Sequence, residues 1–329
     1  MSDQVLLTTT VGSFGKPDYL QKARNANARG KLGETELTEL ERRATEEWIR
    51  RQERLDLDIL VDGEMYRGDM VAYFAERLEG FRLGGLVRSY GNRYYHKPII
   101  ASPVRRPKPM TVDWFRFTQA LTDRPVKGML TGPYTLLDWS YNEAYKTRRD
   151  AALALAEVVR QEAEDLQAAG ARYIQIDEPA IHARPEEIEI AIEAMGIVTQ
   201  NLKAKTISHI CYGDFAAIYP GILDLPVDQL DLAMANYDYR WLALMDRQPF
   251  TKEMAIGIVD VHTHELESVE QAAEGIRKGL KYVSADKLLP HPDCGLKTRP
   301  VDESIAKCKV VVEAARVVRK ELAKKAVPA

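Results

Sequence analysis

Residues 152–179 read ALALAEVVRQEAEDLQAAGARYIQIDEP and carry the clearest structural pattern in the chain. Apolar residues recur every three or four positions in the first part, which predicts a helix with one buried stripe that ends at Gly170. The apolar run at 173–176 then predicts a buried strand, and it leads directly into Asp177 and Glu178. Two acids at the end of a buried strand are costly unless they are solvated, paired or functional. This segment therefore predicts both a helix–strand unit and a polar site at its end.

The same alternation of strand-like and helical runs continues through the chain. Eight parallel strands are the number that closes a (β/α)8 barrel, so we predict an α/β fold with one TIM-type barrel domain over residues 1–329. A doubly wound open sheet is the competing fold, but the chain has neither a dinucleotide-binding glycine motif nor a phosphate-binding Walker loop. The strand-like runs begin at residues 5, 58, 126, 173, 206, 229, 255 and 287.

Two segments do not fit a simple strand–helix repeat. The charged, periodic stretch from Gly33 to Leu57 predicts an N-terminal helical extension. The stretch from Phe81 to Pro109 is rich in glycine, tyrosine and arginine, which predicts an irregular insertion, with a surface hairpin as the alternative.

Composition narrows the class of protein. The chain has 329 residues, of which 45% are hydrophobic, enough for a large core, and a formal net charge of -3 with no one-sided basic run. We therefore expect no nucleic-acid partner. The N-terminus lacks the pattern of a secretory signal, and no run of about 18 apolar residues occurs, so we expect a cytoplasmic protein without a membrane span.

A metal site is predicted from histidine and cysteine. His209 and Cys211 come at the end of a predicted strand, where residues two apart point to the same side. Cys294 follows a later strand, and the loops at strand ends of a barrel meet on one face, so these three residues are candidate ligands of zinc. The alternative is a structural histidine and a cysteine that packs as a small apolar residue, which is how we interpret Cys308 in its helical pattern. Three cysteines are too few for a disulfide framework.

The predicted functional face holds several other polar residues. Active sites of such barrels lie at the carboxyl ends of the strands. The residues at or just after the predicted strands include Ser13, Glu64, Thr131, Asp177, His209, His262 and Cys294.

Seven motifs stand in order and are spread over nearly the whole chain: Thr9–Phe14, Asp62–Glu64, Arg67–Met70, Lys127–Pro133, Ile174–Ala180, His209–Tyr212 and Pro292–Arg299. Together they resemble the catalytic barrel of cobalamin-independent methionine synthase. The wider superfamily also includes uroporphyrinogen decarboxylase-like proteins and zinc-dependent epoxyalkane:coenzyme M transferases.

The resemblance implies an enzyme that holds a thiol substrate on zinc and methylates its sulfur, converting homocysteine to methionine. Zinc coordination suits this chemistry because a free alkyl thiol is mostly protonated at neutral pH. The implied zinc ligands are His209, Cys211 and Cys294.

The resemblance also implies how the rest of the substrate is held. Glu64 and Asp177 suit the ammonium group of homocysteine, and the backbone at Val11 and Ser13 suits its carboxylate. Further residues implied are His262 in proton handling and Trp139 near the methyl donor. The plainer alternatives are structural ion pairs for the two acids, a core position for the tryptophan and a surface loop for the histidine.

The chain departs from the family in two ways. Nothing in it supplies the second barrel with which long methionine synthases bind a folate polyglutamate, so we expect a different donor, for which a methylcorrinoid protein is the candidate partner. An ungapped alignment from His209 also puts Ala233 where the family has a glutamate ligand. Alanine cannot bind metal, which leaves either three protein ligands and an open position or a replacement by Asp231 or Asn236.

Two other functions remain open from the sequence. A coenzyme M transferase would also use a His-x-Cys…Cys zinc site, but its sulfonate substrate should be bound by arginine or lysine rather than by Glu64 and Asp177. A non-catalytic metal-binding homologue is suggested only by Ala233.

Overall fold

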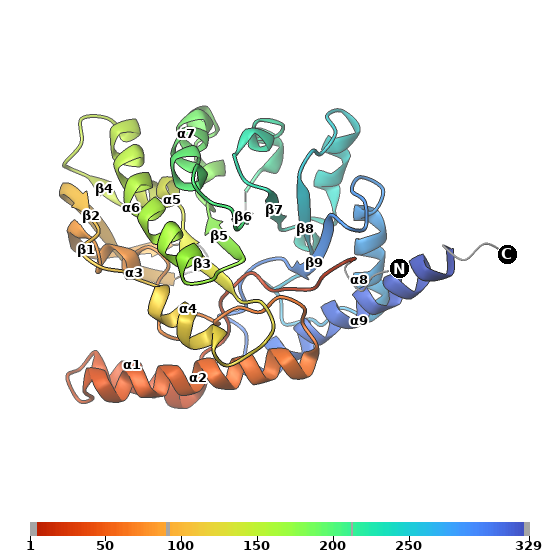
Figure 1. Ribbon diagram of the computed structural model, residues 1–329, viewed down its shortest axis with the longest axis horizontal. Helices are drawn as coiled ribbons and strands as arrows, with labels where there is room; N and C mark the ends of the chain where they lie inside the picture. Colours follow the sequence, from red (N-terminus) through yellow and green to blue (C-terminus); the bar gives the residue numbers. More distant parts are fainter. Residues whose placement is uncertain (1–4, 90–92, 212, 326–329) are drawn as a thin grey trace. The chain divides into compact units, whose positions relative to one another are not determined.

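The computed structural model describes residues 5–89, 93–211 and 213–325. Helices and strands alternate through most of this range, as Figure 1 shows. The helices are α1 (Asp18–Asn27), α2 (Glu34–Leu55), α3 (Ala72–Ala75), α4 (Val112–Gln119), α5 (Pro133–Asp138), α6 (Arg148–Ala168), α7 (Ile188–Thr199), α8 (Val269–Gly279) and α9 (Val301–Lys325). The strands are β1 (Glu79–Ser89), β2 (Arg93–Arg105), β3 (Lys127–Thr131), β4 (Tyr141–Asn142), β5 (Tyr173–Asp177), β6 (Lys205–Ile210), β7 (Gln229–Leu232), β8 (Glu253–Val259) and β9 (Leu288–Pro292).

Six of the eight predicted strands are confirmed. They form one sheet in the order β3-β5-β6-β7-β8-β9, and the pairs β5/β6 and β8/β9 are parallel. Each is short and buried, as expected for strands covered on both faces. The chain is therefore a mixed α/β protein with a parallel sheet.

The first two predicted strands are wrong as regular strands. Residues 5–13 and 57–63 form isolated bridges rather than ladders: Ser13 bridges Gly63, and Leu60 bridges Val126 just before β3. The reason is visible at Thr8, whose backbone N–H donates to the carboxylate of Asp58 at 2.7 Å instead of to a neighbouring carbonyl. The carbonyl of Thr8 still accepts from the N–H groups of Asp58 and Ile59, at 3.1 and 3.0 Å, so the side-chain bond interrupts a regular ladder at this point.

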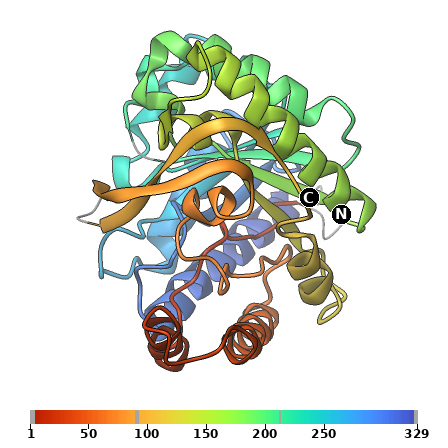
Figure 2. The same ribbon diagram turned by 90° about the vertical axis from the view of Figure 1, so that its left-hand side faces the viewer.

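The insertion predicted to be irregular is instead regular, and the hairpin alternative holds. β1 and β2 pair antiparallel over most of their length, and β2 then pairs in parallel with β4 through Ile99 and Ile100. Figure 2 shows the pair as a long ribbon in orange, with α3 packed against it. Residues 90–92 lie outside the described part of the chain. The aromatic and β-branched residues of the two segments, among them Tyr94, Tyr95, Ile99 and Ile100, favour strand over loop, which outweighs the glycines.

The helix predicted from residue 33 to 57 is α2. Its apolar side buries Leu37, Ala44 and Trp48, and the Trp48 ring stacks on Phe14 at 4.0 Å between ring centroids. The helix ends at Asp56, which adopts the left-handed conformation with φ 66°.

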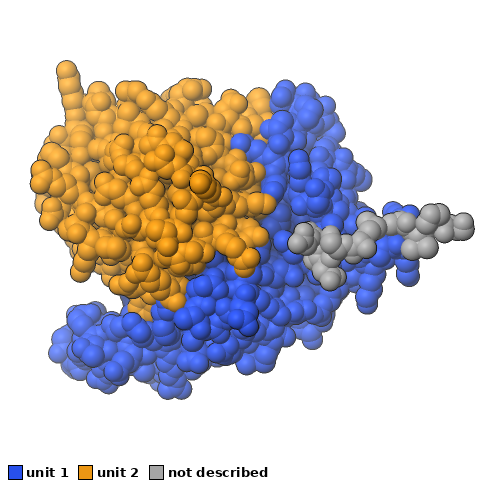
Figure 3. Space-filling view, viewed as in Figure 1, with its two compact units in different colours: residues 1–66, 117–127, 230–329 blue, residues 67–116, 128–229 orange. Residues whose placement is uncertain are grey.

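The chain divides into two compact units, coloured in Figure 3. In unit 1 (residues 1–66, 117–127 and 230–329), α8 and α9 pack on each other and on β8 and β9. In unit 2 (residues 67–116 and 128–229), α5, α6 and α7 pack together, and Leu155 and Leu166 of α6 are fully buried. Across the described residues, each helix is too short or too polar to cross a membrane.

Candidate functional site

The first predicted metal ligands lie at the end of β6. His209 and Cys211 are 2% and 6% exposed. The backbone carbonyl of His209 accepts a hydrogen bond of 3.0 Å from the N–H of Glu178, and Ser208 Oγ donates to the carbonyl of Ile176 at 2.9 Å. Two bonds to the β5 side therefore fix the backbone that carries His209.

The third predicted ligand, Cys294, lies in the loop after β9 and is half-buried. This loop is anchored on both sides of the cysteine. The N–H of Asp293 donates to the carbonyl of Val259 at 2.9 Å, and the N–H of Leu296 donates to the carbonyl of Ser13 at 2.7 Å.

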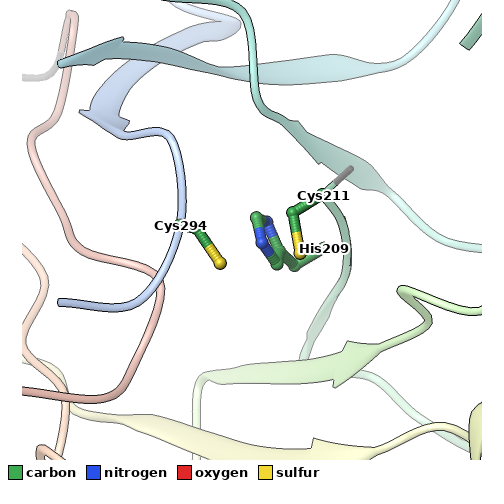
Figure 4. A group of neighbouring side chains, drawn as sticks. All are labelled: His209, Cys211 and Cys294. Carbon is green, nitrogen blue, oxygen red and sulfur yellow. The ribbon is translucent and has the colours of Figure 1, made fainter. Parts of the chain in front are cut away.

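The ligand atoms of His209, Cys211 and Cys294 all lie within 4.8 Å of one another, and Figure 4 shows the three side chains turned toward a common point. One imidazole nitrogen and two thiols form a soft donor set that fits zinc and fits calcium or magnesium poorly. Three such donors leave one position of a tetrahedral ion for another ligand.

Ala233 follows β7 and is buried. Its methyl side chain has no atom that could bind a metal at that position. Its neighbour Asp231 is fully buried, with a carboxylate oxygen 3.7 Å from the Nζ of Lys127. The carboxylate of Asp231 therefore already faces a buried cation, which argues against its replacing the missing glutamate.

The predicted carboxylate-binding segment lies against the Cys294 loop within unit 1. Val11 is buried, and Ser13 is half-buried at its bridge with Gly63. An added Cβ at Gly295 would overlap Ser13 Oγ, so the two loops are in close contact. Through these contacts Ser13 links the chain near Glu64 to the chain near Cys294.

Glu64 sits in a strained turn. Gly63 and Glu64 have φ of 77° and 56°, and the second value is unusual for a residue with a side chain. The turn is held by the N–H of Glu64, which donates to Asp62 Oδ1 at 2.9 Å, and by the Nζ of Lys16, which donates to the carbonyl of Glu64 at 3.1 Å. Strain of this kind costs about 1–3 kcal/mol, and strained residues cluster at active and ligand-binding sites. Burial lowers the pKa of Lys16 to about 8.

The two acids after β5 have different environments. Asp177 is buried, and its Oδ1 accepts a 2.7 Å bond from Gln175. Glu178 is fully buried and accepts bonds from the N–H groups of Tyr134 and Thr135, at 3.0 and 2.7 Å, at the start of α5. Burial raises the pKa of Glu178 to about 7, against the opposing effect of these bonds. Glu178 thus caps the start of α5, a structural role that the position of the two acids after one strand did not predict.

Trp139 ends α5, and its ring lies 6.4 Å from that of Tyr95 on β2. His262 lies in the exposed loop after β8, where its backbone N–H donates to Asp260 Oδ1 at 2.7 Å. In the same loop, Nδ1 of the exposed His264 lies 2.8 Å from a carboxylate oxygen of Glu303.

Sequence and fold comparisons agree on one family. A family model described as "Cobalamin-independent synthase, Catalytic domain" matches residues 6–317. A methionine synthase of Sulfolobus acidocaldarius is 38% identical over 99% of this chain and 96% of its own length, and one of Saccharolobus solfataricus is 38% identical over 98% and 97%. The solved structure of a B12-independent methionine synthase from Shewanella sp. W3-18-1, in complex with selenomethionine, is 28% identical with a TM-score of 0.85 over 97% of this chain and 99% of that one. This chain belongs to the cobalamin-independent methionine synthase family and has the family's catalytic domain.

Proposed function

We propose that this protein is a zinc-dependent methyltransferase that methylates the thiol of homocysteine to give methionine. The observation that carries the proposal is the group of His209, Cys211 and Cys294, a donor set that fits zinc, in a chain of the methionine synthase family. The Shewanella relative, solved in complex with selenomethionine, the selenium analogue of methionine, supports methionine as the product.

His209, Cys211 and Cys294 would hold the metal. When bound, zinc lowers the pKa of a coordinated thiol, so that the sulfur is present as a thiolate at neutral pH. The substrate sulfur would take the fourth position, since Ala233 offers no competing carboxylate.

The amino-acid part of the substrate would be held by groups of matching charge. Glu64 and Asp177 offer two carboxylates to the ammonium group, and the strained turn at Glu64 supports a fixed orientation for the first of them. Val11 and Ser13 offer backbone N–H groups and a hydroxyl to the carboxylate. A sulfonate substrate would instead need a cation where Glu64 and Asp177 stand, which favours homocysteine over coenzyme M.

In the transfer, the substrate sulfur forms a bond to the methyl carbon while the bond from that carbon to the donor breaks and the donor keeps the electron pair. Trp139 would lie beside the donor, and His262 would take part in proton handling. We propose a methylcorrinoid protein rather than folate polyglutamate as the methyl donor, and the assay below compares the two kinds of donor.

We also propose that the whole chain closes into one (β/α)8 barrel. The backbone contacts in unit 1 support this arrangement. Leu60 bonds to the segment just before β3, and Leu6 donates to the carbonyl of Ala285 at 3.0 Å, just before β9. Residues 5–13 and 57–63 would then take the places of the first two barrel strands.

The test is a methionine assay on purified protein with homocysteine and either methylcobalamin or methyltetrahydrofolate, run beside metal analysis. We expect about one zinc per chain and methionine from methylcobalamin. Cys211→Ser and Cys294→Ser should lose both, while Cys308→Ser, the matched control in α9, should keep both. Full zinc occupancy in both ligand variants would refute the proposed site. Methionine formation in the absence of metal would refute the proposed chemistry.

A further inference from the structure

Asp293, the residue before Cys294, makes an unusual set of contacts. It is fully buried, and its carboxylate accepts three backbone hydrogen bonds from a single turn. Oδ1 accepts from the N–H groups of Met234 and Ala235, both at 2.9 Å, and Oδ2 accepts from Asn236 at 2.7 Å. Consecutive N–H groups that converge on one carboxylate form an anion-binding nest.

The backbone of Asp293 makes a further contact, with β8. Its N–H donates to the carbonyl of Val259 at the end of β8. Gly257 of β8 leaves the room that the carboxylate occupies, since an added Cβ there would overlap Oδ1 and approach the Cα of Asp293 to 2.8 Å. Asp293 therefore joins three segments: the end of β8, the turn after β7 and the loop after β9.

Two of those segments are next in sequence to predicted ligand positions. Cys294 follows Asp293 directly, and the turn bound by the carboxylate begins at Met234, immediately after Ala233. Ala233, just before the turn, has no side chain that could bind a metal and so orient the turn. The position of the turn relative to Cys294 therefore depends on the hydrogen bonds of its backbone N–H groups, three of which go to the Asp293 carboxylate.

We propose that Asp293 is a positioning residue for the metal site. It does not bind the ion, but it fixes the backbone of Cys294 against the turn after Ala233, so that the thiol points toward His209 and Cys211. This inference rests on the proposed zinc-dependent function and extends it to a residue that lies outside the ligand set.

The first test is Asp293→Asn. The amide keeps the size and one acceptor oxygen, but its NH2 group cannot accept the bond from Asn236 and faces that N–H instead. Loss of a group that orients a ligand typically lowers metal affinity about 10- to 100-fold. We expect a loss of that size in chelator-competition titrations with zinc. The cobalt(II)-substituted protein should also show a weaker sulfur-to-cobalt charge-transfer band, a spectroscopic change that lowered stability alone would not cause.

Glu162→Gln is the matched control. Glu162 is likewise fully buried and accepts backbone bonds, at 2.9 and 2.6 Å, from Met110 and Thr111, but it belongs to α6 and touches no predicted ligand. We expect this variant to lose thermal stability while it keeps the wild-type zinc affinity and cobalt spectrum. Gly257→Ala, which presses on the same carboxylate from β8, provides a second perturbation if Asp293→Asn fails to fold.

A double-mutant cycle decides whether Asp293 acts through Cys294. In the Cys294→Ser background, Asp293→Asn should cause little further loss of zinc affinity. Wild-type zinc affinity in both Asp293→Asn and Gly257→Ala, with weak binding in Cys294→Ser, would overturn the positioning role and leave the proposed function intact. If Cys211→Ser and Cys294→Ser bind zinc as well as the wild type, the proposed function itself fails.

Discussion

Replacing Gly295 by alanine should weaken homocysteine binding without touching the metal. Gly295 lies between Cys294 and Leu296, and its backbone is held close to Ser13. An added Cβ would overlap Ser13 Oγ, whereas the next nearest atoms, the Cβ and N of Ser13, would lie at 3.4 and 3.6 Å. These last two are ordinary van der Waals distances, so only the hydroxyl has to move.

The structure gives the size of the effect. A serine hydroxyl can turn to another staggered rotamer, so the cost to folding should be on the order of 1 kcal/mol or less. The substrate carboxylate, in contrast, would lose a charge-assisted hydrogen bond from Ser13, which contributes roughly 1.5–3 kcal/mol. We therefore expect the KM for homocysteine to rise about tenfold to more than a hundredfold, with only a small change in Tm.

The assay is steady-state methionine formation at varied homocysteine, with zinc content measured on the same samples. Ser13→Ala is the matched variant, since it removes the hydroxyl directly. It should raise KM to a similar extent, and the double variant should be no worse than Ser13→Ala alone, because alanine at 13 leaves nothing to clash. Wild-type KM in Gly295→Ala would show that Ser13 Oγ does not contact the substrate. Loss of zinc would show that the substitution disturbs Cys294 instead.

Three further predictions concern the same chemistry. Glu64→Gln and Asp177→Asn should each raise the homocysteine KM about tenfold to more than a hundredfold and leave zinc content intact, since each removes one charged hydrogen bond to the ammonium group; unchanged kinetics in both would favour a coenzyme M-like substrate. Ala233→Glu should tighten zinc binding in a chelator titration, because a fourth anionic ligand enters an open position; unchanged affinity would mean that residue 233 does not face the metal. Burial raises the pKa of the Cys308 thiol to about 12, so little of the reactive thiolate is present in the folded chain below that pH. Mass spectrometry should therefore find Cys308 unlabelled by iodoacetamide at about pH 8 to 9 until the protein is unfolded. Labelling of Cys308 in the native protein would contradict the packing role.

The strands show where a sequence pattern suffices and where it does not. The short runs at β5, β6 and β8, rich in aliphatic and β-branched residues, are correctly predicted as buried strands. The runs at residues 5 and 58 are also rich in such residues, yet they form only isolated bridges. The carboxylate of Asp58 accepts a hydrogen bond from the backbone N–H of Thr8, 50 positions away in the sequence. Strand propensity is a local property and cannot predict such a bond.

In the candidate site, too, some residues are predicted from the sequence, whereas the role of others is seen only in the fold. Motif resemblance selected His209, Cys211 and Cys294, and the structure groups their ligand atoms. The strand pattern alone treats Asp177 and Glu178 alike, since both are acids after one strand, and only the resemblance selects Asp177 for the substrate. Only the fold assigns Glu178 to the start of α5 through bonds to Tyr134 and Thr135.

By itself, the sequence determined the α/β class, most of the strands and the family, and it selected the candidate metal ligands, because apolar periodicity and short motifs are local properties of the chain. Tertiary structure alone decided which polar groups meet. Asp293 and Met234 are 59 positions apart, and the sequence around Asp293 gives no sign that its carboxylate accepts three N–H groups from another turn. The energy of a buried carboxylate depends on donors within about 3 Å, whatever their distance along the chain, so its role becomes visible only when the chain is folded.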